Sequence, residues 1–136
     1  THYGFLGYSL ALYENKQSPE DCLWLKEADS ADVGRQAAKE IVADGSIDAV
    51  VCMTGKIAVN LIAELQALGK NVPGDIKVCT FDPESYSNES KITSGIYNFN
   101  DMTEKAVARL EYRHAHPHCK PVKLLTRCEI QEGDTA

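Results

Sequence analysis

The sequence predicts an α/β domain in which a mostly parallel sheet is flanked by helices. Apolar runs that suit sheet strands alternate along the chain with segments of helical periodicity, which is the pattern of strand–helix–strand units. The chain has 136 residues, of which 43% are hydrophobic and 25% charged. This length and composition are typical of one compact globular domain.

The first part of the chain supplies two of the expected helices and two of the expected strands. The apolar run 49–53 has no polar alternation, which suits a parallel strand buried on both faces. The expected elements are a helix over 5–14, a polar turn over 15–21, a short strand over 22–25, a helix over 31–43 capped by Ser30, and the strand over 49–53.

The second part continues the same alternation. Gly69 is a natural residue to follow a helix C-terminus, because glycine adopts the left-handed conformation without steric cost. The expected elements are a helix over 56–68, a strand over 76–81, a polar loop over 82–91, a strand over 92–97, a helix over 102–112 capped by Asn100 or Asp101, a last strand over 122–128 and a frayed polar tail.

Composition and charge exclude several classes of protein. With a net charge of −6 and 14 Lys and Arg scattered along it, the chain offers a poor nucleic-acid surface, so any DNA contact is expected in another segment. No apolar run approaches the roughly 18 residues of a membrane helix, and no leader opens the sequence. Five cysteines without a C-x-x-C motif, two of them (Cys52 and Cys79) in apolar runs, indicate a reduced, cytoplasmic protein.

Ligands of parallel sheets bind beyond the carboxyl ends of the strands. The segments that follow the expected strands are 27–29, 54–56 and 82–85. We therefore look for binding residues there first.

One ordered set of motifs is more specific than periodicity. An apolar strand (47–53) precedes a helix that ends in Leu68-Gly69, then Val-Pro-Gly-Asp-Ile (72–76) and a strand that ends in Phe81-Asp82. This order resembles the effector-binding domain of the lac repressor / galactose repressor (LacI/GalR) family of transcriptional regulators. Weaker similarities extend it to nearly the whole chain; they lie at Phe5–Tyr8, Ile92–Ser94, Asn98-Phe99 and Lys123–Arg127.

The resemblance implies a periplasmic-binding-protein-like (type I) fold, in which two α/β lobes close on a small ligand. Residues 1–130 are then the effector-binding domain, mainly its second lobe, and 131–136 a polar tail; the DNA-binding head lies outside this chain. The implied function is the ligand-sensing and dimerisation part of a repressor, with a sugar-like effector in the interlobe cleft. The implied partners are that effector, a second copy of the chain and, through the missing N-terminal domain, operator DNA; neither catalysis nor a cofactor is expected.

Three candidate ligand residues follow the central strands. Asp82 matches the family's acid after the aromatic, and a carboxylate accepts hydrogen bonds from two sugar hydroxyls; alternatively it starts a turn before Pro83. Thr54-Gly55 stands where the family has an Asn-Asp pair, which is a departure from the family's pattern for sugar recognition. Lys56 could meet an anionic ligand or be a solvated residue at a helix start.

Three further candidates come from other segments. Asp29 follows the strand expected over 22–25, and it is either a ligand contact or an acid that stabilises a helix N-terminus. Tyr97 and Phe99 match the family's crossover segment, where an aromatic ring can stack on a sugar or pack between lobes. Gly4 stands where many members have a ligand-binding Arg, which is a second departure from the family pattern.

Other classes stay open at this level. A solute-binding protein of a sugar transporter has the same two-lobe α/β architecture. A small α/β enzyme or a receiver-like domain has the same alternation of strands and helices. The His114–Cys119 segment is rich in metal-ligating side chains, but we expect no physiological metal site because it falls in a turn with Pro117. No spacing groups the hydroxyls, histidines and acids into a catalytic triad.

Overall fold

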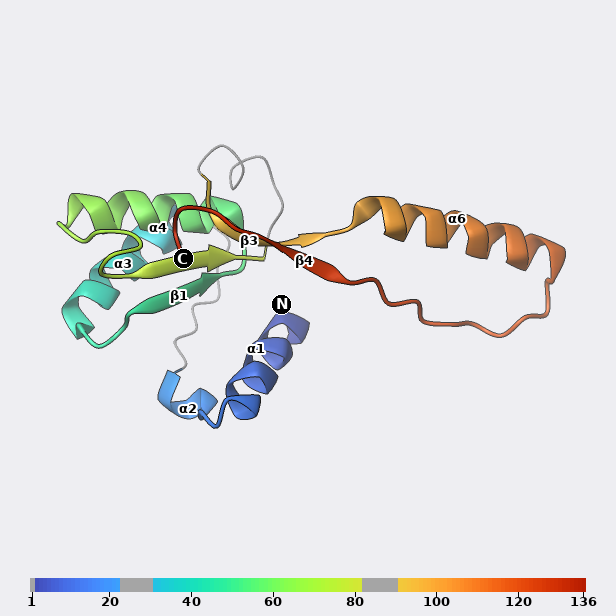
Figure 1. The fold of residues 1–136 in the computed structure, drawn as a ribbon, viewed down its shortest axis with the longest axis horizontal. Coiled ribbons are helices and arrows are strands. Elements are labelled where there is room, and N and C mark those ends of the chain that lie inside the picture. The colour runs from blue at the N-terminus through green and yellow to red at the C-terminus, as the bar shows by residue number, and fades with distance from the viewer. Residues whose placement is uncertain (1, 23–30, 82–90) are drawn as a thin grey trace.

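The computed structural model describes residues 2–22, 31–81 and 91–136. Residues 23–25 of the strand expected over 22–25, the Ser30 cap and most of the 82–91 loop therefore lie outside the described residues, while Cys22 ends a helix. The elements are α1 (His2–Glu14), α2 (Pro19–Cys22), α3 (Ala31–Asp44), β1 (Ala49–Cys52), α4 (Gly55–Ala67), β2 (Lys77–Thr80), β3 (Thr93–Tyr97), α6 (Phe99–Ala115) and β4 (Cys128–Gln131) (Figure 1).

The described strands form one sheet in the order β1-β2-β3-β4. β1 and β2 pair in parallel, as do β2 and β3, whereas β4 runs antiparallel to β3. The register aligns Cys52 with Thr80 and Thr80 with Ser94 across the three parallel strands. The predicted α/β class with a mostly parallel sheet is confirmed.

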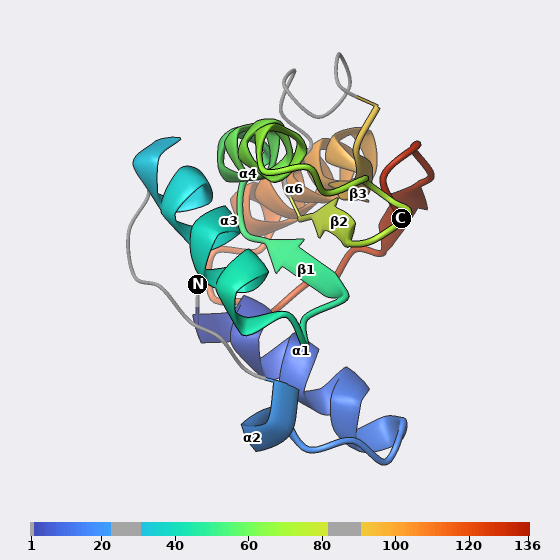
Figure 2. The ribbon, with the colours of Figure 1, turned by 90° about the vertical axis from the view of Figure 1, so that its left-hand side faces the viewer.

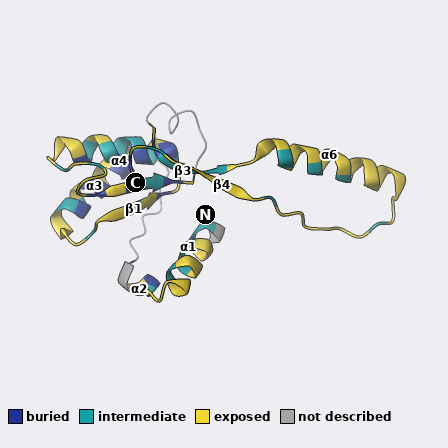
Figure 3. Cartoon of the chain, in the orientation of Figure 1, coloured by how far each residue is buried: buried dark blue, intermediate teal, exposed yellow. Residues whose placement is uncertain are grey.

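The hydrophobic core lies between the sheet and the helices α3 and α4 (Figures 2 and 3). It is formed by Ala37, Ala38, Ile41, Cys52, Ala58, Leu61, Leu65, Ile76, Val78 and Ile92. Gly34 lets the two helices approach closely, because a Cβ there would lie 2.6 Å from the Ile57 carbonyl oxygen and 2.8 Å from the Leu61 amide nitrogen. Small residues on α3 therefore set the distance between the two helices.

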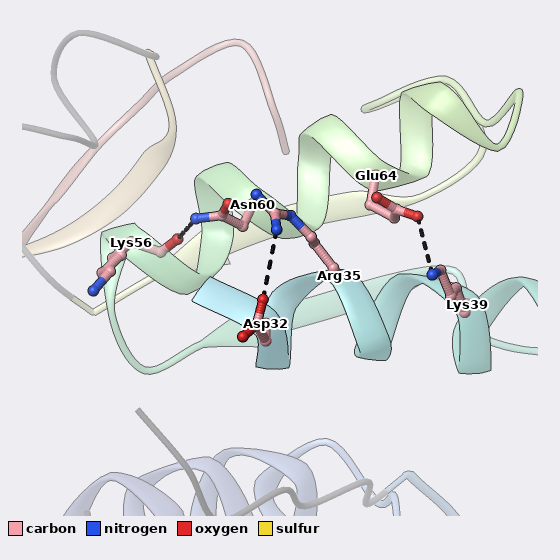
Figure 4. A network of polar contacts seen from close by, with 6 residues as sticks. All are labelled: Asp32, Arg35, Lys39, Lys56, Asn60 and Glu64. Carbon is pink, nitrogen blue, oxygen red and sulfur yellow. Dashed lines mark hydrogen bonds and ion pairs between the residues drawn. The ribbon is translucent and has the colours of Figure 1, made fainter. Parts of the chain in front are cut away.

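Polar side chains line the solvent side of this helix pair (Figure 4). Lys39 of α3 reaches Glu64 of α4 at 3.7 Å, and Arg35 pairs with Asp32 within α3 at 3.5 Å. Exposed pairs of this kind contribute at most about 1 kcal/mol each. Apolar packing rather than charge pairing thus holds α3 against α4.

Both ends of α4 are capped. Thr54 is the N-cap, and its side chain accepts from the Ile57 amide. At the other end, the Lys70 amide donates to the Leu65 carbonyl and the Gly69 amide to the Gln66 carbonyl, with Gly69 at a φ of 82°. These paired bonds form a Schellman motif, which confirms the expected role of Gly69.

The second face of the sheet is more open than the sequence predicts. Burial of the 49–53 strand on both faces is wrong, because Val51 is 39% exposed although Cys52 is buried. α1 lies on the opposite side of β1 from α4 (Figures 1 and 2). α1 itself leaves Leu6 and Leu10 about half exposed.

Residues 99–127, which we call the arm, project away from the sheet (Figure 1). The arm consists of α6 and an irregular return segment (116–127) that leads back to β4. No residue of α6 is buried, and large apolar side chains such as Phe99, Val107 and Leu110 are 48–66% exposed. The arm is thus a protruding hairpin that exposes many large apolar side chains.

Two expected boundaries in the arm are wrong. α6 begins at Phe99 rather than Met102, because the Asn98 side chain accepts from the Asp101 amide and caps the helix earlier. The last strand begins at Cys128 rather than Val122. Cys128 pairs with Tyr97, the last residue of β3, so the residues before it extend beyond the end of any neighbouring described strand.

The C-terminal tail is ordered, and the expectation that it frays is wrong. Thr135 is 7% exposed, and its hydroxyl donates to the Val78 carbonyl at 2.7 Å and accepts from the Thr93 amide at 3.1 Å. The Val78 amide also donates to the Thr135 carbonyl at 2.8 Å. The tail therefore joins β2 to the start of β3.

The structure also differs from the expectation at α2, which is a short helix where a turn was expected.

Candidate ligand site at the carboxyl ends of the strands

Because β1, β2 and β3 are parallel, their carboxyl ends lie at one edge of the sheet. The described residues that follow or end these strands are Met53, Thr54, Phe81, Tyr97 and Asn98. Three of them present large apolar or aromatic side chains with exposed fractions of 37–44%. This edge is the place where the fold positions ligand-binding groups.

Thr54 and Lys56 lie at this edge beside β1. The half-buried Thr54 accepts from the Ile57 amide at 3.4 Å, so its oxygen serves the helix start. Lys56 is exposed in the first turn of α4, and its carbonyl oxygen accepts from the Asn60 side chain at 2.9 Å. In Figure 4 its side chain points away from the polar contacts between α3 and α4. Its amine is therefore available to solvent or to an anionic group.

Tyr97 and Phe99 form an aromatic pair where β3 leads into α6. Their ring centroids lie 6.2 Å apart at an interplanar angle of 61°, an edge-to-face arrangement. Both are exposed, Tyr97 at 44% and Phe99 at 58%. They line a hollow of about 320 Å³ together with Ile96, Asn98, Asn100 and Glu129. The hollow combines aromatic faces with amide and carboxylate groups, a combination suited to a small polar ligand with apolar faces.

Sequence reasoning missed Met53 and Phe81. Each directly follows the last residue of its strand, and the Phe81 amide donates to the Cys52 carbonyl at 3.2 Å, which continues the ladder between β1 and β2. Both side chains are more than one-third exposed. The pairing register of β1 and β2 identifies them, because it shows that both residues lie just beyond the last paired residues of their strands. The sequence alone does not give this register.

Gly4 brings α1 against this same edge. A Cβ on Gly4 would lie 2.8 Å from Cε of Met53, so the terminal methyl of that side chain covers the glycine. Where many family members have an Arg, this chain has Gly4 in apolar contact with the Met53 side chain. The other two candidates, Asp29 and Asp82, lie outside the described residues, and their role stays a prediction.

Cys52 and Cys79, on the neighbouring strands β1 and β2, are less acidic than ordinary thiols. Burial raises the pKa of the Cys52 thiol to about 12, with a smaller contribution from Cys79, and burial also raises the pKa of Cys79. Both thiols therefore remain protonated at neutral pH. Among residues 2–22, 31–81 and 91–136, no three His, Cys, Asp or Glu side chains are grouped so that they could hold a metal ion.

The comparisons with known proteins agree with this architecture. Residues 5–136 match the family model of the periplasmic binding protein-like domain. No curated protein matches the chain. None of the described helices has the length and apolarity needed to cross a membrane.

Several solved structures share the fold. They include a complex of the transcriptional regulator CelR with cellobiose (22% identity, TM-score 0.78, covering 96% of this chain and 41% of that one). The Lac repressor bound to ONPG gives 18% identity, a TM-score of 0.79 and coverages of 97% and 40%. A LacI family regulator from Enterococcus faecium with bound ribose has 21% identity and a TM-score of 0.76, and the match covers 99% of this chain and 51% of that one.

The chain thus spans between two-fifths and about half of the length of these structures. The mostly parallel sheet flanked by helices matches the periplasmic-binding-protein-like fold of these regulators. The family match covers almost every residue, so the chain belongs to the periplasmic binding protein-like domain family and has the fold of the LacI-type regulators.

Proposed function

We propose that this chain is the ligand-sensing part of a LacI-type transcriptional repressor and binds a carbohydrate-like effector at the carboxyl edge of its sheet. The observation that carries the proposal is the exposed aromatic pair Tyr97–Phe99, which lines a hollow at the very edge where this fold binds ligands. Aromatic faces stack on the apolar face of a sugar ring, while Asn98, Asn100 and Glu129 offer groups for its hydroxyls.

The relatives support this ligand class. Cellobiose is bound in CelR and ribose in the Enterococcus faecium regulator. All three structures named above are of transcriptional regulators rather than enzymes. On this proposal Asp82, Asp29, Thr54 and Lys56 complete the site, the protein acts in the cytoplasm, and it has no catalytic activity.

The surface of the chain supports the proposal that a further lobe completes the cleft. The accessible surface is 9817 Å², whereas a compact monomer of 15.0 kDa has about 7,000 Å². The arm contributes to this excess, because α6 has no buried residue. We infer that residues 1–130 are mainly the second lobe, that the first lobe packs on α6, and that a separate head binds the operator.

Dimerisation is part of the same proposal. A shallow hollow of about 360 Å³ lies along the outer side of α4, lined by Val59, Ile62, Ala63, Gln66, Val72, Asp134 and Thr135. Its lining combines apolar side chains of α4 with polar groups of the C-terminal tail, a mixture suited to an isologous contact with a second copy. Ligand-dependent changes between the lobes would then reach the DNA-binding heads of the dimer.

The test is a thermal-shift screen of the longer protein that contains this chain, against sugars, sugar phosphates and sugar acids. A ligand at about one hundred times its dissociation constant adds roughly 2.7 kcal/mol of stability. We expect Tyr97→Ala to remove the shift, while the control Tyr13→Ala keeps it, because Tyr13 is an exposed aromatic residue on α1 that does not line the hollow. Asp82→Asn tests the acid predicted from the family pattern. A shift that survives Tyr97→Ala would contradict the assigned site.

A further inference from the structure

The hollow that Tyr97 and Phe99 line carries a negative charge. Glu129 also lines it, and none of the other described lining residues is a Lys, Arg or His. The Glu129 side chain is exposed, and within residues 2–22, 31–81 and 91–136 no cation forms an ion pair with it, not even Arg127, two residues earlier. The hollow therefore offers a ligand one unpaired carboxylate and no positive charge.

The position of this carboxylate is fixed by strand pairing. β4 runs antiparallel to β3, and Glu129 lies opposite Ile96, while Cys128 lies opposite Tyr97. Glu129 therefore lies beside the end of β3, next to the aromatic pair. The Tyr97 and Phe99 rings meet edge to face, with centroids 6.2 Å apart at 61°, so ring faces remain available to a ligand. A carboxylate and the electron-rich face of an aromatic ring both attract a cation.

The cations on neighbouring elements do not neutralise Glu129. The Lys105 amine donates to the Asp101 carboxylate at 2.6 Å, and the Arg109 guanidinium donates to a backbone carbonyl of the return segment at 2.6 Å. Lys56 follows β1, which β2 separates from β3, and two strand spacings amount to about 10 Å. An anionic group bound by Lys56 would thus lie at the other end of the edge, and the hollow itself favours positive charge.

We propose that the effector is a carbohydrate with a protonated amine, and that Glu129 binds its ammonium group beside the Tyr97–Phe99 pair. This inference rests on the proposed function, because it takes the same hollow as the ligand site. An ammonium group has three donors, and its hydrogen bonds to a carboxylate are stronger than those of a neutral hydroxyl. Asn98 and Asn100 then serve the hydroxyls. A sugar phosphate or sugar acid would instead bring a second negative charge to Glu129.

The test compares matched sugars on the longer protein that contains this chain. The pairs are glucosamine with glucose, galactosamine with galactose, and mannosamine with mannose, so that an ammonium group replaces one hydroxyl on the same ring. Each sugar is screened by thermal shift at about pH 6, where such amines are protonated, and each sugar that binds is titrated by calorimetry. Glu129→Gln keeps the side-chain shape without the charge. The control Glu132→Gln removes the same charge from an exposed acid of the tail that does not line the hollow.

In at least one pair, we expect the amino sugar to bind at least about tenfold more tightly than its neutral partner, because the ammonium gains both the carboxylate and a ring face. Glu129→Gln should bring the two dissociation constants to within about twofold, since the charge-assisted bond is lost. Glu132→Gln should keep the wild-type preference.

Two results would overturn this inference and leave the proposed function standing. The first is a neutral sugar, sugar phosphate or sugar acid that binds while no amino sugar binds more tightly than its neutral partner. The second is an equal loss of affinity for both members of a pair in Glu129→Gln, which would mean that Glu129 pairs with a cation of the first lobe instead of the ligand. Absence of a shift with every sugar and sugar derivative would overturn the proposed function as well.

Discussion

Gly34 is the residue on which the packing of α3 against α4 depends most directly. Gly34→Ala would place a methyl group 2.6 Å from a backbone oxygen of α4, and the backbone cannot yield as a flexible side chain could. We expect the free energy of unfolding to fall by about 1–3 kcal/mol. The measurement is urea denaturation of the purified chain.

Gly7 provides the matched control for this substitution. It lies within α1, and a Cβ there would meet nothing within 4 Å. Gly7→Ala should therefore stabilise the chain by about 0.5–1 kcal/mol through helix propensity alone. If both substitutions had the same effect, the close approach of the two helices would not be the cause.

Cys52 gives the chain a pH dependence whose sign can be worked out. The pKa of this thiol is raised by burial to about 12, whereas in the unfolded chain it lies near 9.0. Above pH 9 the unfolded state loses the proton and the folded state keeps it, so stability falls as pH rises, by up to about 1.4 kcal/mol per unit. Denaturation of the wild type and Cys52→Ala between pH 8 and 10.5 should show the steeper fall in the wild type. Parallel curves would contradict burial of the thiol.

Individual binding residues were less predictable than their neighbourhood. The expectation that Thr54 and Lys56 follow β1 is met, yet the Thr54 oxygen is engaged in capping α4. Met53 and Phe81 were missed, because an apolar residue at the end of an apolar run looks like its continuation. Only the strand register separates the last buried residue from the first one exposed at the edge.

At the scale of elements, local signals predicted the boundaries of α3 and α4 well but missed the Asn98 cap of α6, and features that depend on distant residues were predicted poorly. α3 and α4 were predicted to within a residue or so, because caps and 3.6-residue periodicity are written in adjacent residues. The strand expected over 122–128 failed, since a strand needs a neighbour and β3 ends opposite Cys128. Polar composition likewise suggested a frayed tail, although Thr135 is fixed by hydrogen bonds to two strands.

The C-terminal tail is the element whose contribution can be measured most directly. Thr135→Val keeps the side-chain shape but leaves the Val78 carbonyl and the Thr93 amide without the hydroxyl, which should cost about 1–3 kcal/mol of unfolding free energy. Thr103→Val on the exposed face of α6 is the control and should change stability by less than about 0.5 kcal/mol. Thermal denaturation compares the two; equal, small effects would mean that the tail adds nothing to the sheet.

At the scale of the whole molecule, the class of fold followed from the alternation of strands and helices, but the shape did not. Periodicity identifies an apolar helix face without saying what covers it. On α4 that face is buried against the sheet, with Leu61 and Leu65 at 1% and 0% exposure. On α6 the same kind of face is left open (Figure 3). The sequence pattern therefore could not distinguish a core helix from a protruding one.

This contrast predicts a wide spread of local stability within one chain. Amide hydrogens of α4 exchange only when the core opens, whereas those of α6 need no loss of buried apolar contacts and should exchange at least about tenfold faster. Hydrogen–deuterium exchange with mass spectrometry on the 136-residue chain measures both helices in one sample. In the longer protein, where we propose that a first lobe covers the arm, α6 should gain protection and α4 should not change. Equal protection of α6 in both would mean that the arm is stable without a covering lobe.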